Sequence, residues 1–297
     1  MVKSLLVLLC LIPSFNYAQD ASKPILYLNE ELKQIDELTY SNKVLKSIYR
    51  EDIVKKDSLT IKRLRKAYDF GSFNETELLQ VQKLLHKYLN IKDFDRNIIF
   101  AYRDSLLGYL PYKNSIQHRK KLDEFDVISE KEYLKRRKQY DVYQKKCKKF
   151  AKINNTSPIY IYSENVEFTF KTKHHTKQKI PNILKSIFFE NLKYGHVILK
   201  PNGQFFYYSF LTQAQTKKML ESDWEPFIKD FNSVKSNSKK YSLEFIDKMY
   251  KDFERSMREQ AMRRIKQIQK ERAKSKNLSS PKTGRITPPH CYTHASY

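Results

Sequence analysis

The stretch from Gly195 to Phe210 most constrains the fold of this chain, because it has the pattern of a β-hairpin. Two runs rich in β-branched and aromatic residues, 196–199 and 204–210, flank the turn Lys200-Pro201-Asn202-Gly203. Proline presets the first corner of the turn, asparagine tolerates the second, and glycine accepts a positive φ. Helical patterns lie on both sides, so we expect the hairpin to complete a sheet in an α/β domain.

Residues 1–18 have the organisation of a secretory signal peptide. Lys3 supplies a positive n-region, residues 5–12 an apolar h-region, and Pro13-Ser14 a break before Ala18, after which we expect cleavage. The apolar run is shorter than the roughly 20 residues of a membrane-spanning helix, and no later run is long enough. The sequence therefore predicts an exported protein, periplasmic or extracellular, without a transmembrane segment in the mature chain.

Charge favours a polyanionic partner. The chain has 57 Lys and Arg against 33 Asp and Glu, a formal net charge of +24. Such an excess favours contact with nucleic acid, anionic lipid or acidic glycans, although a lysine-rich composition without any ligand is the alternative. Only five glycines are present, and neither a P-loop nor a G-x-G-x-x-G motif occurs, which argues against phosphate binding by a P-loop or a Rossmann turn.

The region 19–95 is predicted to be mainly helical. Apolar residues fall at helical spacing from Leu28 to Leu38 and again from Val44 to Tyr49. Residues 57–68 fit either another helix or a short strand at 59–62. A more convincing helix, with apolar residues up to Leu89, begins after Asn74.

The region 96–235 is predicted to alternate strands and helices. We expect a strand at 97–102, a loop over 104–126, and a long helix from the capping box at Ser129 to Phe150. A strand at 158–162 and a helix at 180–192 are predicted to follow. After the hairpin we expect a helix that starts at Thr212 and breaks near Pro226. A basic amphipathic helix follows over 241–275. The polar tail 276–297 is predicted to be disordered.

This order of elements resembles the thioredoxin fold. The resemblance implies a parallel strand pair finished by an antiparallel hairpin. Thioredoxin-like oxidoreductases have C-x-x-C after the first core strand, whereas residues 103–108 contain no cysteine, and Tyr194-Gly195 stands in place of the family's cis-proline. The resemblance therefore implies the fold without dithiol exchange, which needs an attacking thiolate and a resolving thiol.

Two candidate thiols, Cys147 and Cys291, remain once Cys10 leaves with the signal peptide. They could pair in an oxidising compartment, but spacing alone leaves this open. Cys147 lies on an apolar stripe among lysines, which favours a buried small side chain over a reactive thiol. Cys291 lies near His290 and His294, but a flexible tail would pay the full ordering entropy of a metal site.

Histidines and carboxylates offer further candidates. His174, His175 and Lys177 belong to a basic segment, 171–177, that could bind an anion or a metal or serve in acid–base chemistry. No carboxylate or cysteine stands at ligand spacing, so an exposed basic loop is favoured. Asp104 and Glu132 are expected to be solvated acids. The aromatic hairpin could stack bases or sugars if one of its faces is exposed.

The C-terminal helix is the strongest charge-based candidate. Its candidate binding residues are Arg258, Arg263, Arg264, Lys266 and Lys270. They could lie along an anionic surface or polymer, or they could belong to a solvated helix packed on its own domain. The leading interpretation is an exported, non-catalytic, thioredoxin-like binding or structural protein of the cell envelope that needs no cofactor. A polyanion binder and a thiol- or histidine-dependent enzyme are the alternatives.

Overall fold

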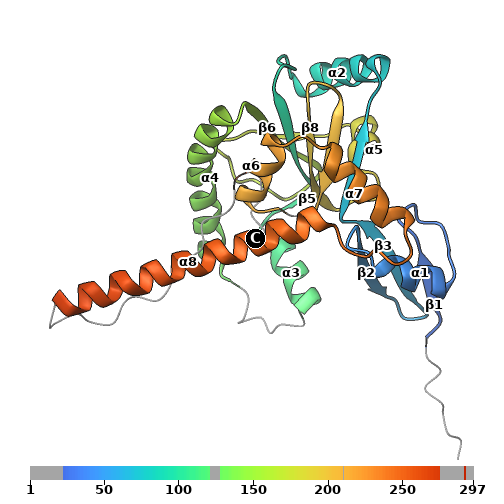
Figure 1. The fold of residues 1–297 in the computed structure, drawn as a ribbon, viewed down its shortest axis with the longest axis horizontal. Helices are drawn as coiled ribbons and strands as arrows, with labels where there is room; N and C mark the ends of the chain where they lie inside the picture. Colours follow the sequence, from blue (N-terminus) through green and yellow to red (C-terminus); the bar gives the residue numbers. More distant parts are fainter. Residues whose placement is uncertain (1–22, 121–127, 210, 275–290, 292–297) are drawn as a thin grey trace, which may run out of the picture.

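The computed structural model describes residues 23–120, 128–209, 211–274 and 291 (Figure 1). The predicted signal peptide and nearly all of the predicted tail lie outside these residues. The described residues form a mixed α/β structure with two sheets, one of three strands in the order β1-β3-β2 and one of six in the order β4-β9-β8-β5-β6-β7. The predicted α/β class is therefore confirmed. No helix among the described residues has the length and apolarity needed to cross a membrane.

The N-terminal region is not mainly helical, and the prediction for 19–95 is wrong over its first half. Its elements are β1 (Ile25–Leu28), α1 (Glu37–Val44), β2 (Tyr49–Lys55), β3 (Thr60–Lys66) and β4 (Tyr68–Ser72). β3 pairs in parallel with β1 and antiparallel with β2. This pairing outweighs the helical spacing of the leucines: Leu28 ends a strand, Leu32 has a φ of 66°, and Leu38 is 71% exposed.

Helix α2 (Glu75–Leu89) begins where the sequence predicts. Asn74 and Glu77 form a reciprocal capping box at its start. Strand β4 belongs to the larger of the two sheets, because it pairs antiparallel with β9. The predicted boundary at residue 95 therefore does not separate two independent units.

The larger sheet contains the predicted strands and the hairpin. Its further strands are β5 (Asn97–Leu107), β6 (Thr156–Val166), β7 (Lys177–Lys179), β8 (Tyr194–Leu199) and β9 (Gln204–Tyr208). β5 runs parallel to β6 and antiparallel to β8, and β8 and β9 form the expected hairpin with Leu199 opposite Phe205. Gly203 has a φ of 84°, as its place in the turn requires.

Two strands extend beyond their predicted ends. β5 and β6 stay paired as far as Leu107 and Val166, so residues 103–107 are strand and do not begin a helix. The predicted loop 104–126 is also wrong in part, because α3 (Tyr109–Lys120) follows directly. The additional paired residues are partly polar, so the apolar runs from which the strands are predicted end before the strands do.

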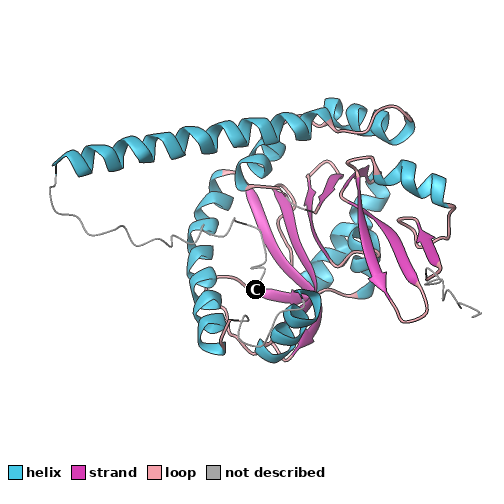
Figure 2. Ribbon diagram, turned by 90° about the horizontal axis from the view of Figure 1, so that it is seen from below, coloured by secondary structure: helices cyan, strands magenta, loops and turns pink. Residues whose placement is uncertain are grey.

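Helices cover both faces of the larger sheet (Figure 2). The helices are α4 (Glu130–Ile153), α5 (Asn182–Phe189), α6 (Gln213–Glu221), α7 (Glu225–Ser236) and α8 (Glu244–Lys274). Ile99 packs with residues of α4, α6, α7 and the start of α8. Its neighbours Ile98 and Phe100 pack with residues of α2 and α5 on the opposite face. The predicted break near Pro226 is confirmed, since α7 begins there as a separate helix.

Candidate functional site

Helix α8 has a packed first part and a projecting second part. Phe245, Ile246 and Met249 are at most 8% exposed and belong to the core that covers the sheet. From Lys251 onward, most of the described side chains are exposed, and Arg263 reaches 82%. At a rise of 1.5 Å per residue, the helix continues about 37 Å past Met249. Figures 1 and 2 show it extending away from the body beyond α4.

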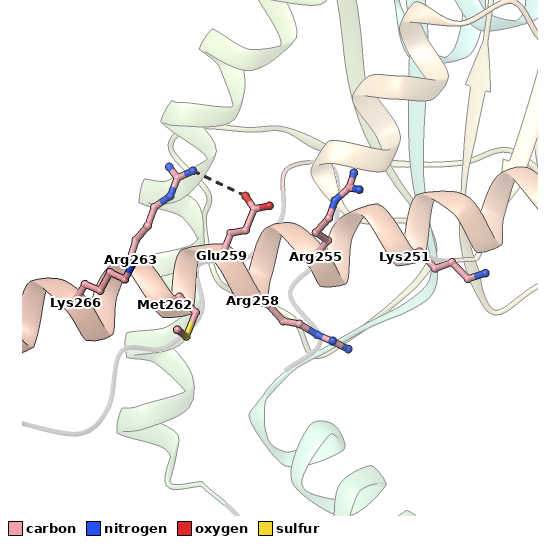
Figure 3. Close-up of a pocket in the computed structure, with 7 residues that line it drawn as sticks. All are labelled: Lys251, Arg255, Arg258, Glu259, Met262, Arg263 and Lys266. Carbon is pink, nitrogen blue, oxygen red and sulfur yellow. Dashed lines mark ion pairs between the residues drawn. The ribbon is translucent and has the colours of Figure 1, made fainter.

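One stripe of the projecting part carries most of its described charge (Figure 3). Residues spaced three, four, seven and eight apart lie on one side of a helix. A shallow hollow of about 630 Å³ runs along this side and is lined by Lys251, Arg255, Arg258, Glu259, Met262, Arg263 and Lys266. We call this set the basic stripe. Five of its seven members are cations, so it attracts anions.

Few carboxylates neutralise the basic stripe. Glu259 is its only acid, and its Oε2 lies 3.9 Å from Nη2 of Arg263. Nη2 of Arg255 lies 3.1 Å from Oδ1 of Asp252, one turn earlier on the same helix. Both pairs are exposed, and such pairs contribute little because water competes for them. The stripe therefore keeps a positive excess and remains accessible to a partner.

The sequence anticipated part of this stripe. Arg258, Arg263 and Lys266 were predicted from charge alone, and the structure places them on one side of α8. Lys251 and Arg255 also line the stripe and are not among the predicted residues, although their spacing of four is visible in the sequence. The side chains of Arg264 and Lys270 fall outside the described ones.

His175 does not lie in an exposed loop, and that prediction is wrong for this residue. Its side chain is 4% exposed, and its Nδ1 lies 3.1 Å from Oδ1 of Asp141 on α4. A carboxylate can only accept, so Nδ1 carries the proton. Asp141 also accepts the backbone N–H groups of Lys173 at 2.8 Å and His174 at 3.0 Å. The carboxylate therefore fixes the segment that leads into β7.

Burial sets the charge of this cluster. Burial is the largest cause of the lowered pKa of His175, and the charge of Lys177 acts in the same direction. Asp141 raises the pKa, and the net result is a value of about 4. Burial, followed by the charges of Arg137 and Arg103, lowers the pKa of Lys177 to about 7. His175 is therefore neutral at pH 7. With its ring enclosed by Tyr140 and Tyr160, it has a structural role.

The two candidate thiols are bonded to each other. Cys147 on α4 and Cys291 form a disulfide with their Cα atoms 5.3 Å apart. They are 1% and 5% exposed. Neither presents a thiolate for nucleophilic chemistry in this state. Among the described residues, no three His, Cys, Asp or Glu side chains are grouped as metal ligands, and His290 and His294 lie outside them.

No family model, curated protein or solved structure matches this chain.

The remaining candidates are engaged within the fold. Asp104 Oδ1 accepts hydrogen bonds from the Tyr102 hydroxyl at 2.8 Å and from Lys185 Nζ at 2.9 Å. Burial raises the pKa of Asp104, but these hydrogen bonds outweigh it and hold the pKa below its usual value. Glu132 pairs with Arg136 on the surface of α4. The side chain of Asp104 is 39% exposed, so it is in contact with solvent as the sequence predicts, but it is also paired with Lys185.

The aromatic hairpin contributes mainly to the core. Phe206, Tyr207 and Tyr208 are at most 4% exposed, and Phe205 packs partly buried against the α2 and α5 side. Phe206 and Tyr207 point to opposite faces of the sheet, and helices cover both. These side chains offer no open face for stacking bases or sugars.

Proposed function

We propose that this protein is an exported, non-catalytic binding protein that holds an extended polyanion along the basic stripe of α8. The observation that carries the proposal is the stripe itself. It places five cations over about 22 Å of helix, beyond the packed body and with one carboxylate among them. An evenly charged polymer fits this spacing, because successive phosphates or sulfates can each meet a cation.

The electrostatics favour an exposed, sequence-independent contact. A guanidinium group binds an oxyanion with paired N–H donors. The stripe has three guanidinium groups, those of Arg255, Arg258 and Arg263. Because the stripe is open to water, its affinity should arise mainly from counterion release. Binding should therefore depend on charge density more than on the identity of the polymer.

We further propose that residues 96–235 form a thioredoxin-like scaffold for this helix. The proposal is supported by the order β9-β8-β5-β6, the parallel β5–β6 pair and the antiparallel hairpin. The placement of α4 and α6 on one face and α5 on the other also supports it. Residues of the preceding β4 and the following α7 and α8 extend this core.

Binding is tested by charge neutralisation on the stripe. Arg255→Gln, Arg258→Gln and Arg263→Gln in one variant should weaken binding of a single-stranded oligonucleotide and of heparin at least tenfold. The matched control replaces Lys83, Lys87 and Lys92 with Gln, three exposed lysines in and after α2. Equal loss of affinity in both variants would show that only net charge matters and would overturn the site.

Two measurements test the other parts of the proposal. Mass spectrometry of the mature protein should give an N-terminus at Gln19, and a retained residue 1 would contradict export by a cleaved signal. Purified protein should not reduce the disulfides of insulin. Reductase activity that is lost in Cys147→Ser would contradict the non-catalytic part.

A further inference from the structure

A polar pocket lies where the smaller sheet meets α5. It has a volume of about 400 Å³ and is lined, among others, by Arg63 from β3, Asp104 from β5, Asn182, Lys185 and Ser186 from α5, and Lys193. We call it the α5 pocket. It is separate from the basic stripe, with which it shares no lining residue. Its volume lies in the range of pockets that hold small molecules.

Cations outnumber carboxylates beside this pocket. Arg63 and Arg65 both donate to Oδ2 of Asp52, and Lys193 Nζ lies 4.0 Å from the same oxygen. The side chains of Arg63 and Arg65 are only 20% and 12% exposed. Two guanidinium groups and an ammonium therefore share one carboxylate in a partly buried place. Charge in such a place is costly unless it is paired.

The neighbouring acid cannot relieve this excess. Asp104 already accepts from Lys185 and from the Tyr102 hydroxyl. Glu190 also lines the pocket but is exposed, so its charge is screened by water. Arg63 and Lys193 therefore share the single carboxylate of Asp52 with Arg65.

Arg63 also has an unused hydrogen-bond donor. Its Nε is buried and has no hydrogen-bond partner among the described residues. A buried donor left unpaired costs the free energy of its lost hydration. Asn182 adds a side-chain amide to the same lining. Donors and cations therefore dominate this part of the lining, and an anionic acceptor would complement them.

We propose that the α5 pocket binds the oxyanion group of a small molecule, with Arg63 and Lys193 as its main ligands. A phosphate or a carboxylate would balance the positive charge that Asp52 alone leaves uncompensated beside Arg63 and Lys193. Both anions match the planar donor arrangement of a guanidinium group. The pocket's place beside Asp104 would let a ligand with an attached hydroxyl or amine also meet the polar wall of β5.

The test is calorimetric titration of the full mature chain with inorganic phosphate and, separately, with succinate. We expect saturable binding of at least one anion, and comparison of the two distinguishes phosphate from carboxylate ligands. Arg63→Gln should weaken binding about tenfold or more and Lys193→Gln about threefold. Lys92→Gln and the triple α8 variant should bind as the wild type does.

Two results would overturn the proposal. One is the absence of saturable binding for both anions. The other is unchanged affinity in Lys193→Gln, which is expected to fold normally because its side chain is 60% exposed. This second variant decides the question even if Arg63→Gln fails to fold. If phosphate or succinate binds but the wild-type protein does not bind a polyanion, the result contradicts the proposed function of the basic stripe and leaves the proposal for the α5 pocket intact.

Discussion

The salt dependence of polyanion binding gives the sharpest test of the basic stripe. For single-stranded nucleic acid, the slope of log affinity against log salt is about −0.7 for each phosphate neutralised. Five cations on the stripe predict a slope of about −3.5 or steeper. Between 50 and 200 mM NaCl, such a slope lowers the affinity by about 130-fold.

Removing three of these cations should change the slope by a known amount. The variant Arg255→Gln, Arg258→Gln, Arg263→Gln should make the slope less steep by about 2.1. Cations farther along α8 steepen both slopes equally, so the difference between the two proteins is the informative quantity. The affinity should be measured by fluorescence anisotropy with a labelled oligothymidine, at constant pH and at several salt concentrations.

The control separates the stripe from general charge. The variant Lys83→Gln, Lys87→Gln, Lys92→Gln removes the same number of charges from α2 and the segment after it, and α2 covers the opposite face of the sheet. Its slope should equal that of the wild type. A wild-type slope shallower than −2, or the same reduction in both variants, would refute the reasoning.

Three further predictions concern stability. Cys291→Ser should lower the free energy of unfolding by about 2–5 kcal/mol, because its disulfide joins residues 144 apart, and an unchanged urea midpoint would contradict this. His175 has a folded pKa of about 4, below its unfolded value, so the unfolded chain binds more protons and stability should fall as the pH drops from about 6.5 to 4. His175→Gln should flatten this part of the pH profile in denaturant titrations, and an unchanged slope in this variant would contradict the assignment. Gly195→Ala should destabilise by about 1–3 kcal/mol, since an added Cβ would lie 2.3 Å from Cε2 of Tyr207; a wild-type melting temperature would show that the ring moves freely.

Local signals in the sequence predicted the centre of the larger sheet well. The turn residues up to Gly203 define the hairpin, the apolar run from Asn97 defines β5, and Asn74 marks the start of α2. In each case the residues that specify the element are neighbours in sequence. Propensity and capping rules apply directly to such elements.

Elements that depend on distant partners were missed. β1 and β2 are strands because both pair with β3, although the apolar spacing from Leu28 to Leu38 and from Val44 to Tyr49 also fits a helix. His175 is held in a buried place by Asp141, 34 residues earlier on α4, which accepts hydrogen bonds from its Nδ1–H and from the backbone N–H groups of Lys173 and His174. The basic stripe was recognisable from charge, but its projection depends on where the packing of residues 245–249 ends.

The bond between Cys147 and Cys291 changes what cleavage of this chain would do. Residues 148–290 lie between its two ends, and they include four of the six strands of the larger sheet, β6 to β9, and all of α8. A protease that cuts once in this interval yields two fragments that remain one covalent molecule. The nicked protein would migrate as two bands on a gel only after reduction. In an oxidising compartment, a single cut would therefore leave the cationic helix attached to the protein.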